Sequence, residues 1–189
     1  MQRLMNWRLL TRLFSQGHSI EGISLEALPF YDKVTQPLYR VQEHVGDYKF
    51  DMLRLQVSKR KITYFDDLGL VGLASLNMEA NHCFLTEGVS DFMSLKLMRM
   101  STFPEDSNVL GVTKLGGDAN ARKLLLTLFD NYTIMADDDA TGIKNASNFR
   151  QWLVQNGKSV KLTKPTAGCK DISAEFLRTV EDYYPDYKR

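Results

Sequence analysis

Cysteine and histidine are scarce in this chain of 189 residues. Only Cys83 and Cys169 occur, which excludes a disulfide-stabilised scaffold and a four-cysteine zinc module. So few cysteines are typical of a reduced, cytoplasmic protein, and we expect both thiols to be buried and unreactive. The histidines lack the spacing and the cysteine companions of zinc ligands, so no zinc site is expected from His18, His44 and His82.

Long apolar runs and an excess of one sign of charge are also missing. No apolar stretch approaches the ~20 residues that a transmembrane helix needs, so we expect a soluble protein with no membrane partner. The 24 lysines and arginines and the 23 aspartates and glutamates leave a net charge of +1, so a nucleic acid would need a local basic patch. With 43% hydrophobic residues and no low-complexity tract, the chain has the composition of an ordinary globular protein.

The first twenty residues contain Arg3, Arg8 and Arg12 but no acidic residue. This pattern resembles an amphipathic targeting peptide, but its apolar positions suit a core-facing helix over residues 3–14 equally well.

The rest of the first 80 residues has little regular pattern. The segment 13–28, with Gly17 between two short helical patterns, is compatible with a helix-turn-helix, although such a turn is common in any helical subdomain. Residues 61–65 and 70–75 flank two aspartates and predict a hairpin. We therefore expect a smaller α+β segment over residues 1–80.

From residue 81 onward, strand patterns and helix patterns alternate. Strands are predicted over 82–86, 108–113, 132–136 and 159–163, and helices over 90–99, 119–129 and 141–155. Short apolar strands separated by helices of three or four turns are typical of right-handed crossovers between parallel strands. The sequence therefore predicts an α/β fold with a parallel four-stranded sheet and flanking helices.

Acidic side chains follow three of these four strands. Glu87 follows the first strand, a run of three aspartates follows the third, and Asp171 follows the fourth. The carboxyl ends of parallel strands are where such sheets gather substrate. Alternate side chains of an extended segment point to one side, so Asp137 and Asp139 can face one cation while Asp138 points away.

Crowded carboxylates repel one another unless a cation neutralises them, and such hard oxygen ligands suit Mg²⁺. Glu87 reaches the same cation if the first strand lies beside the third. The alternative is that the aspartate run caps the following helix and complements its dipole. Gly88 and Gly142 follow the acids and permit a close backbone approach where each strand turns into a helix. The glycine patterns of P-loops and dinucleotide-binding loops are absent, which excludes P-loop NTP hydrolysis.

These residues resemble the signature of the Toprim domain, which is shared by bacterial and phage-type primases, type IA and II topoisomerases, OLD-family nucleases and RecR-type recombination mediators. The signature is a strand ending in Glu-Gly with an aspartate shortly after it, then a strand ending in Asp-x-Asp-x-x-Gly. Here these are Glu87-Gly88 with Asp91, and residues 137–142. Lys170-Asp171 followed by Glu175, and the glycine turn over 111–117, resemble the primase versions. The resemblance covers about 81–177.

The resemblance implies Mg²⁺- or Mn²⁺-dependent nucleotidyl transfer, in which a primase-like protein of DNA replication joins nucleotides on a single-stranded nucleic acid. It implies Glu87 as the acid/base, Asp137 and Asp139 as catalytic metal ligands, and Asp91 and Asp171 as further ligands. A topoisomerase is excluded because 189 residues are too few for a tyrosine domain and a DNA gate. A Toprim nuclease and a non-catalytic nucleic-acid- or protein-binding module remain as alternatives.

The expected organisation is a segment over 1–80 that binds nucleic acid or a partner, a catalytic Toprim domain over 81–177, and a tail over 178–189. The sequence has no zinc-binding template reader and no helicase module, so we expect a helicase or template-recognition protein as partner. The residues expected to contact nucleic acid are Lys59, Arg60, Lys61, Lys144 and Lys170. The alternative for the first three is a solvated strand edge, and for Lys144 an ordinary helix surface.

Overall fold

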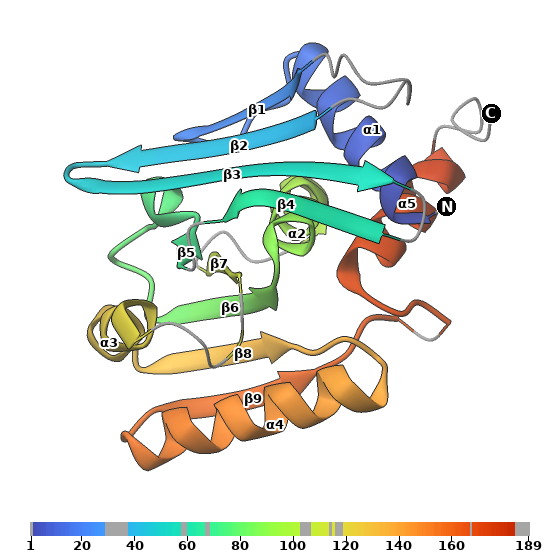
Figure 1. The fold of residues 1–189 in the computed structure, drawn as a ribbon. Helices are drawn as coiled ribbons and strands as arrows, with labels where there is room; N and C mark the ends of the chain where they lie inside the picture. The colour runs from blue at the N-terminus through green and yellow to red at the C-terminus, as the bar shows by residue number, and fades with distance from the viewer. Residues whose placement is uncertain are drawn as a thin grey trace. The chain divides into compact units, whose positions relative to one another are not determined.

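The computed structural model describes residues 2–28, 38–57, 60–66, 69–102, 107–113, 115, 119–166 and 168–183. The chain divides into two compact units (Figure 1). The N-terminal unit comprises residues 1–67 and 72–75, and the C-terminal unit comprises residues 68–71 and 76–189. In the described part of the chain, no helix combines the length and the apolar character that a membrane crossing requires. Both cysteines are buried, as expected.

The N-terminal unit consists of one helix and a four-stranded antiparallel sheet. Its elements are α1 (Gln2–Ser15), β1 (Ile23–Leu28), β2 (Leu38–Val45), β3 (Tyr48–Val57) and β4 (Arg60–Asp66), with the strands in sequence order across the sheet. The predicted helix over 3–14 is thus confirmed. Helix α1 covers the sheet with Trp7 and Leu10, and the Trp7 ring stacks on Tyr39 with centroids 5.5 Å apart. Both aromatic side chains are almost fully buried, so this contact forms the centre of the unit's core.

For this half, the structure rules out one motif that the sequence allowed and contradicts one prediction. The segment 13–28 is not a helix-turn-helix, because its second part forms β1, which pairs with β2 along its whole length. Residues 61–65 and 70–75 do not form a hairpin: the first segment lies in β4, which pairs with β3, while β5 (Leu70–Val71) joins the other sheet. Tertiary packing determines which strand a short strand pairs with, and the local sequence pattern does not show that partner.

A buried carboxylate fixes the turn that follows β5. Glu43 of β2 is 1% exposed, and its two oxygens accept hydrogen bonds from the backbone of Gly72 (2.8 Å) and Ala74 (2.7 Å). These donors lie in and just before the 3-10 turn η1 (Leu73–Ser75), which belongs to the N-terminal unit. Two backbone N–H groups therefore replace the water that this charge loses on burial.

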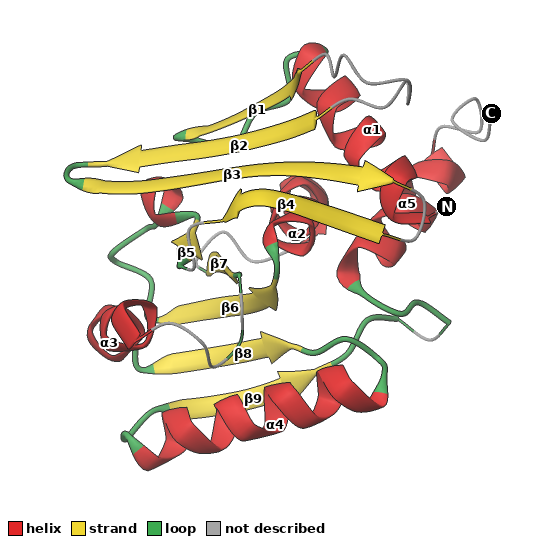
Figure 2. Ribbon diagram, in the orientation of Figure 1, coloured by secondary structure: helices red, strands yellow, loops and turns green. Residues whose placement is uncertain are grey.

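The C-terminal unit is built on a five-stranded sheet in the order β5-β7-β6-β8-β9 (Figure 2). Its strands after β5 are β6 (His82–Glu87), β7 (Asn108–Val112), β8 (Asn131–Met135) and β9 (Ser159–Thr163), and its helices are α2 (Val89–Thr102), α3 (Ala119–Leu128), α4 (Ala140–Gln155) and α5 (Ile172–Tyr183). The four predicted strands are all parallel, and β5 adds an antiparallel edge. The predicted fold class, α/β with flanking helices, is confirmed.

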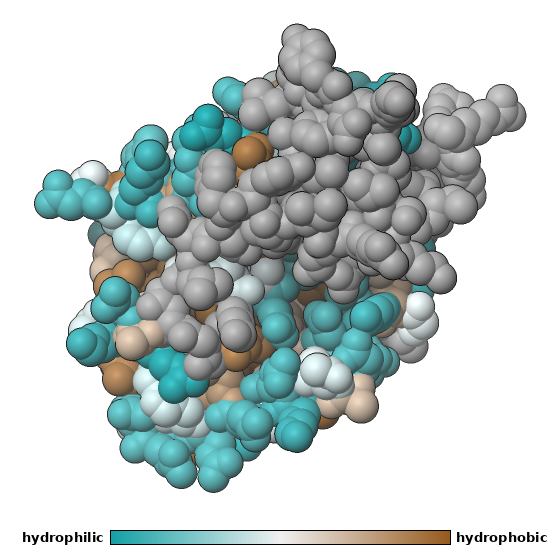
Figure 3. Space-filling model, in the orientation of Figure 1, coloured by the Kyte–Doolittle hydropathy of each residue, from teal (hydrophilic) through white to brown (hydrophobic). Residues whose placement is uncertain are grey.

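The helices bury one face each. Helix α4 buries Ala146, Phe149 and Leu153, which recur at helical spacing, and exposes polar side chains. The surface along α4 is accordingly mostly hydrophilic (Figure 3). Gly111 of β7 allows α2 to lie close to the sheet, because a Cβ atom there would be 2.7 Å from the Cβ of Phe92.

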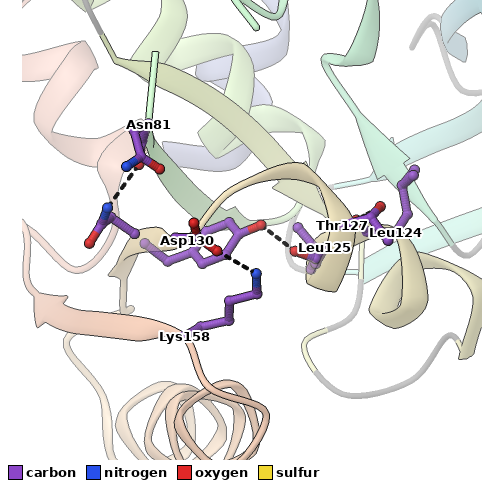
Figure 4. Close-up of polar contacts among 8 residues, drawn as sticks. Asn81, Leu124, Leu125, Thr127, Asp130 and Lys158 are labelled. Carbon is purple, nitrogen blue, oxygen red and sulfur yellow. Dashed lines mark hydrogen bonds and ion pairs between the residues drawn. The ribbon is translucent and has the colours of Figure 1, made fainter. Parts of the chain in front are cut away.

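The amino ends of the strands are held by structural contacts (Figure 4). Lys158 forms an ion pair with Asp130 at 2.8 Å, the Asn131 side chain donates to the carbonyl of Asn81 at 3.1 Å, and the hydroxyl of Tyr132 donates to the carbonyl of Leu125 in α3. These contacts link the chain before β6, β8 and β9 to one another. They fix the strand register at the edge opposite to the one that carries the acidic residues.

Candidate active site at the carboxyl edge of the sheet

Two acidic residues end neighbouring strands of the sheet. Strand β6 pairs with β8 in parallel, with Thr86 opposite Met135, and Glu87 is the last residue of β6. Asp137 follows β8 by two residues. The first predicted strand therefore lies beside the third, which is the condition under which Glu87 and Asp137 share one edge of the sheet.

A glycine follows each of these acids at a position where the local backbone leaves no room for, or disfavours, a side chain. Gly88 has a φ of +99°, which few other residues adopt, and its N–H donates to the carbonyl of Val112 at 2.9 Å. At Gly142 the constraint is steric, because a Cβ atom there would lie 2.6 Å from the Cβ and 2.9 Å from the carbonyl oxygen of Asp137. The first turn of α4 can therefore lie against Asp137 only if residue 142 has no side chain.

The aspartate run is held by two lysines. The N–H of Asp138 donates to the carbonyl of Lys170 at 2.7 Å, and the Asp138 carboxylate pairs with Lys164 at 2.7 Å. Asp139 is the N-cap of α4: one carboxylate oxygen accepts from the N–H of Gly142 at 2.8 Å, and the other lies 3.0 Å from Nζ of Lys170. The Gly142 N–H and then Lys170 hold the pKa of Asp139 below its usual value. The capping role considered from the sequence is therefore real for Asp139.

Asp91 connects α2 to α5. It lies in the first turn of α2, and its Oδ1 accepts hydrogen bonds from the backbone N–H (2.9 Å) and the hydroxyl (2.7 Å) of Ser173. Burial raises the pKa of Asp91 to about 7, and the negative charges of Asp171 and Asp137 raise it further than the two Ser173 hydrogen bonds can offset. Three predicted site residues thus lie within electrostatic reach of one another.

Asp171 and Glu175 have structural partners as well. Oδ1 of Asp171 accepts from the N–H of Ala174 at 2.7 Å and so caps the start of α5. Glu175 accepts hydrogen bonds from the backbone N–H, at 3.0 Å, and the hydroxyl of Thr166. The segment 170–175, Lys-Asp-x-x-x-Glu, therefore orders the loop between β9 and α5 and holds Lys170 against Asp139.

The carboxylates fit a hard divalent cation by their chemistry. Asp91, Asp137 and Asp171 crowd enough to raise the pKa of Asp91, which is the effect expected of carboxylates that no cation neutralises. Oxygen donors of this kind are those that Mg²⁺ and Mn²⁺ prefer. Within the described residues, no three acidic, histidine or cysteine side chains are already gathered in the geometry of a metal site.

The predicted nucleic-acid contacts are distributed over both units. Lys59 lies outside the described residues, and Arg60 and Lys61 lie in β4, the edge strand of the N-terminal sheet. Lys144 is exposed on α4, and Lys170 pairs with Asp139. Lys164 and Ser173, the partners of Asp138 and Asp91, were not predicted, because a lysine or a serine at these positions carries no sequence signal of a functional site. Part of the predicted glycine turn, residues 114 and 116–118, also lies outside the described residues.

A cavity of about 580 Å³ lies on one face of the sheet. Its floor is formed by side chains of β6, β8 and β9, and its sides by α2 and α5. Lys164, Thr166 and Glu175 of the acidic edge are among the lining residues, together with Phe84, Met135 and Ile172. The cavity therefore extends from the acidic edge over a floor of mixed apolar and polar side chains.

The fold is similar to those of DnaG-type primase catalytic cores. The DnaG catalytic core matches with a TM-score of 0.60 and 16% identity, over 98% of this chain and 78% of that chain. A DnaG primase catalytic domain bound to single-stranded DNA matches with a TM-score of 0.59 and 14% identity, over the same shares. The zinc-binding and RNA polymerase domains of Aquifex aeolicus primase match with a TM-score of 0.59 and 16% identity, over 99% of this chain and 61% of that chain.

These likenesses show a shared fold that includes both units of the chain. No protein-family model matches the sequence, and no curated protein sequence matches it.

Proposed function

We propose that the protein is a primase-like nucleotidyltransferase that joins nucleotides on a single-stranded nucleic acid in DNA replication. The observation that carries this proposal is the placement of Glu87 and Asp137 at the ends of adjacent parallel strands, with Asp91 buried nearby and its pKa raised by burial and by the charges of Asp171 and Asp137. The similarity of the whole fold to DnaG-type catalytic cores supports it.

Asp137, Asp139, Asp91 and Asp171 would hold Mg²⁺ or Mn²⁺, with Glu87 beside them. When bound, such a cation lowers the pKa of an attacking hydroxyl and offsets charge on the transferred phosphoryl group. Glu87, at the end of β6, accepts the proton of the attacking hydroxyl as a new P–O bond forms at the α-phosphorus and the bond to the leaving pyrophosphate breaks. Lys170 lies 3.0 Å from the Asp139 carboxylate and would turn toward a substrate phosphate if a cation were held by that oxygen.

The remaining basic residues would bind the single-stranded nucleic acid. Four residues would contact phosphates of the nucleic acid without base selectivity. They are Lys59, Arg60 and Lys61 of the N-terminal segment and Lys144 on α4. The organisation that we propose is a binding segment over 1–80, a catalytic domain over 81–177 and a tail over 178–189. A helicase or a template-recognition protein would bring this core to its template.

The deciding experiment is a denaturing gel of labelled products. Unlabelled single-stranded DNA, labelled nucleotides and Mg²⁺ or Mn²⁺ are incubated with the wild type, Asp137→Asn and Asp138→Asn. We expect labelled oligomers with the wild type and none with Asp137→Asn. Asp138→Asn is the matched control, because its carboxylate pairs with exposed Lys164, and it should retain most of the activity.

A Toprim nuclease is the second candidate, since the same carboxylates and cation activate water as readily as a sugar hydroxyl. End-labelled template in a parallel lane separates the two, because shortened template without incorporation identifies a nuclease. If neither product appears while binding of the strand falls with salt and survives Asp137→Asn, the protein is a non-catalytic binding module.

A further inference from the structure

The N-terminal unit contains a second cavity, of about 720 Å³, between α1 and the first two strands. Its lining includes Arg8, Thr11, Arg12, Phe14, Glu26 and Tyr39. Ligand pockets typically have volumes of about 300–1,000 Å³, so this cavity has room for a mononucleotide. None of its lining residues belongs to the acidic edge.

A buried hydroxyl points to a ligand. Tyr39 is fully buried, and its hydroxyl has no acceptor for its hydrogen, because Arg8 beside it can only donate. Burial raises the pKa of this phenol, and the positive charge of Arg8 beside it opposes the rise. Arg8 is exposed, so its guanidinium can turn onto an incoming group and uncover the hydroxyl. Tyr39 then gains the acceptor that it lacks.

The charge of the cavity favours an anion. Arg8 and Arg12 are one helical turn apart on α1, so both guanidinium groups lie on one side of the helix. The acidic residue of the cavity, Glu26, lies opposite Arg40 in the β1–β2 register, and the charge of Glu26 acts on Arg40. The Thr11 hydroxyl donates to the carbonyl of Trp7 at 2.8 Å, so the positive charge of the cavity comes from Arg8 and Arg12.

We propose that this cavity binds a nucleoside phosphate, as a free nucleotide or as one nucleotide of a single strand. Paired guanidinium groups and a phenol hydroxyl match the oxygens of a phosphate group, since arginine binds phosphate in a bidentate way. Phe14 and Leu25 give the cavity an apolar side on which a base can rest. The site is separate from the proposed catalytic function, because it requires no divalent cation.

The fluorescence of Trp7 can report binding in this cavity, because its ring stacks on that of Tyr39 with centroids 5.5 Å apart. The experiment uses full-length Trp152→Phe protein, in which Trp7 is the remaining tryptophan, in buffer containing EDTA. Trp7 fluorescence and calorimetry follow titrations with AMP, inorganic phosphate, adenosine and a short oligothymidylate. We expect saturable binding of AMP, weaker binding of phosphate at the same site, and no binding of adenosine. EDTA removes any contribution from a metal-dependent site.

Three variants test the assignment of the residues. Arg8→Met and Tyr39→Phe should each weaken binding about tenfold, since a hydrogen bond to a charged group is lost. Lys49→Gln, an exposed residue of β3 outside the cavity, is the matched control and should bind like the parent protein. Because its hydroxyl has no acceptor and its neighbour Arg8 is exposed, Tyr39→Phe should not lower the thermal stability of the free protein, and this result separates a ligand role from a structural one.

Binding of the oligothymidylate alone, lost in Arg8→Met, would identify a strand as the source of the phosphate. Binding of AMP alone would identify a free nucleotide. The proposal is overturned if neither ligand gives saturable heat or fluorescence change, if Arg8→Met and Tyr39→Phe bind like Lys49→Gln, or if Tyr39→Phe destabilises the free protein.

Discussion

Single residues at the acidic edge stabilise the local structure and also contribute to the electrostatics of the site. Asp91 orders the start of α5 through Ser173, yet it is crowded by two other carboxylates. Asp139 caps α4 and also pairs with Lys170. Such dual use means that a loss of activity in a simple alanine variant does not by itself identify a catalytic role.

Asp91 makes the metal-free protein sensitive to pH. Its pKa in the folded chain, about 7, lies above the usual 3.8, so the folded state favours the protonated form. The stability that Asp91 contributes is therefore complete at acidic pH and is lost as pH rises from about 4 to about 7. In EDTA, urea unfolding should show the wild type losing more stability over this range than Asp91→Asn, which cannot ionise. Parallel pH profiles of the two proteins would contradict the assignment.

Gly142 should be intolerant of a side chain for a steric reason. The Cβ of Gly142→Ala would lie 2.6 Å from the Cβ of Asp137, so α4 or Asp137 must move. We expect a loss of about 1–3 kcal/mol in the free energy of unfolding, together with loss of nucleotidyl transfer. Gly157→Ala is the control: its φ of +83° carries a strain cost of about 1 kcal/mol, but a Cβ there meets no atom within 4 Å. It should lower stability and leave activity intact.

At the scale of elements, the start of α4 combines a helix cap with an acidic edge. Asp139→Asn keeps a good N-cap acceptor but removes the charge, whereas Asp139→Ala removes both. Thermal or urea unfolding should therefore show about 1 kcal/mol lost in Asp139→Ala and little change in Asp139→Asn. Both variants should lose nucleotidyl transfer if Asp139 binds the cation. If Asp139→Asn keeps full activity, the residue is a cap and no ligand.

The order of the strands decides which elements form the site. Strand β6 lies between β7 and β8, so the chain after β6 and the chain after β8 emerge side by side. The fourth strand, β9, pairs with β8 and brings the Lys170–Asp171 loop to the same edge. Strand β7 lies on the other side of β6. The same strands in another order would separate Glu87 from Asp137.

At the scale of the whole molecule, cation binding should be visible as stability. A ligand that binds only the folded state adds about 2.7 kcal/mol when its concentration is 100 times its dissociation constant. We therefore expect Mg²⁺ or Mn²⁺ to raise the melting temperature of the wild type, measured by differential scanning calorimetry, and not that of Asp137→Asn. Asp138→Asn should respond like the wild type. An equal rise in all three proteins would place the cation elsewhere.

The C-terminal unit is the part of the protein that the sequence predicted best: four of its strands and three of its helices were expected, whereas α5 and the place of β5 in this sheet were not. Its strands and helices have strong local periodicity, and the predicted strand over 159–163 and helix over 141–155 agree with β9 and α4 to within one residue. The placement of acids after three strands also follows from the sequence, because parallel strands present their carboxyl ends at one edge.

The tertiary structure decided what local pattern cannot encode. The N-terminal sheet, the antiparallel β5 and the pairing of β4 with β3 depend on contacts between distant segments, for which short strands carry no sequence signal. The same holds for the partners of the acids: Lys164 meets Asp138, and Ser173 meets Asp91, only because β9 and α5 pack against the edge. The sequence specified which groups carry charge, and folding specified which of them are neighbours.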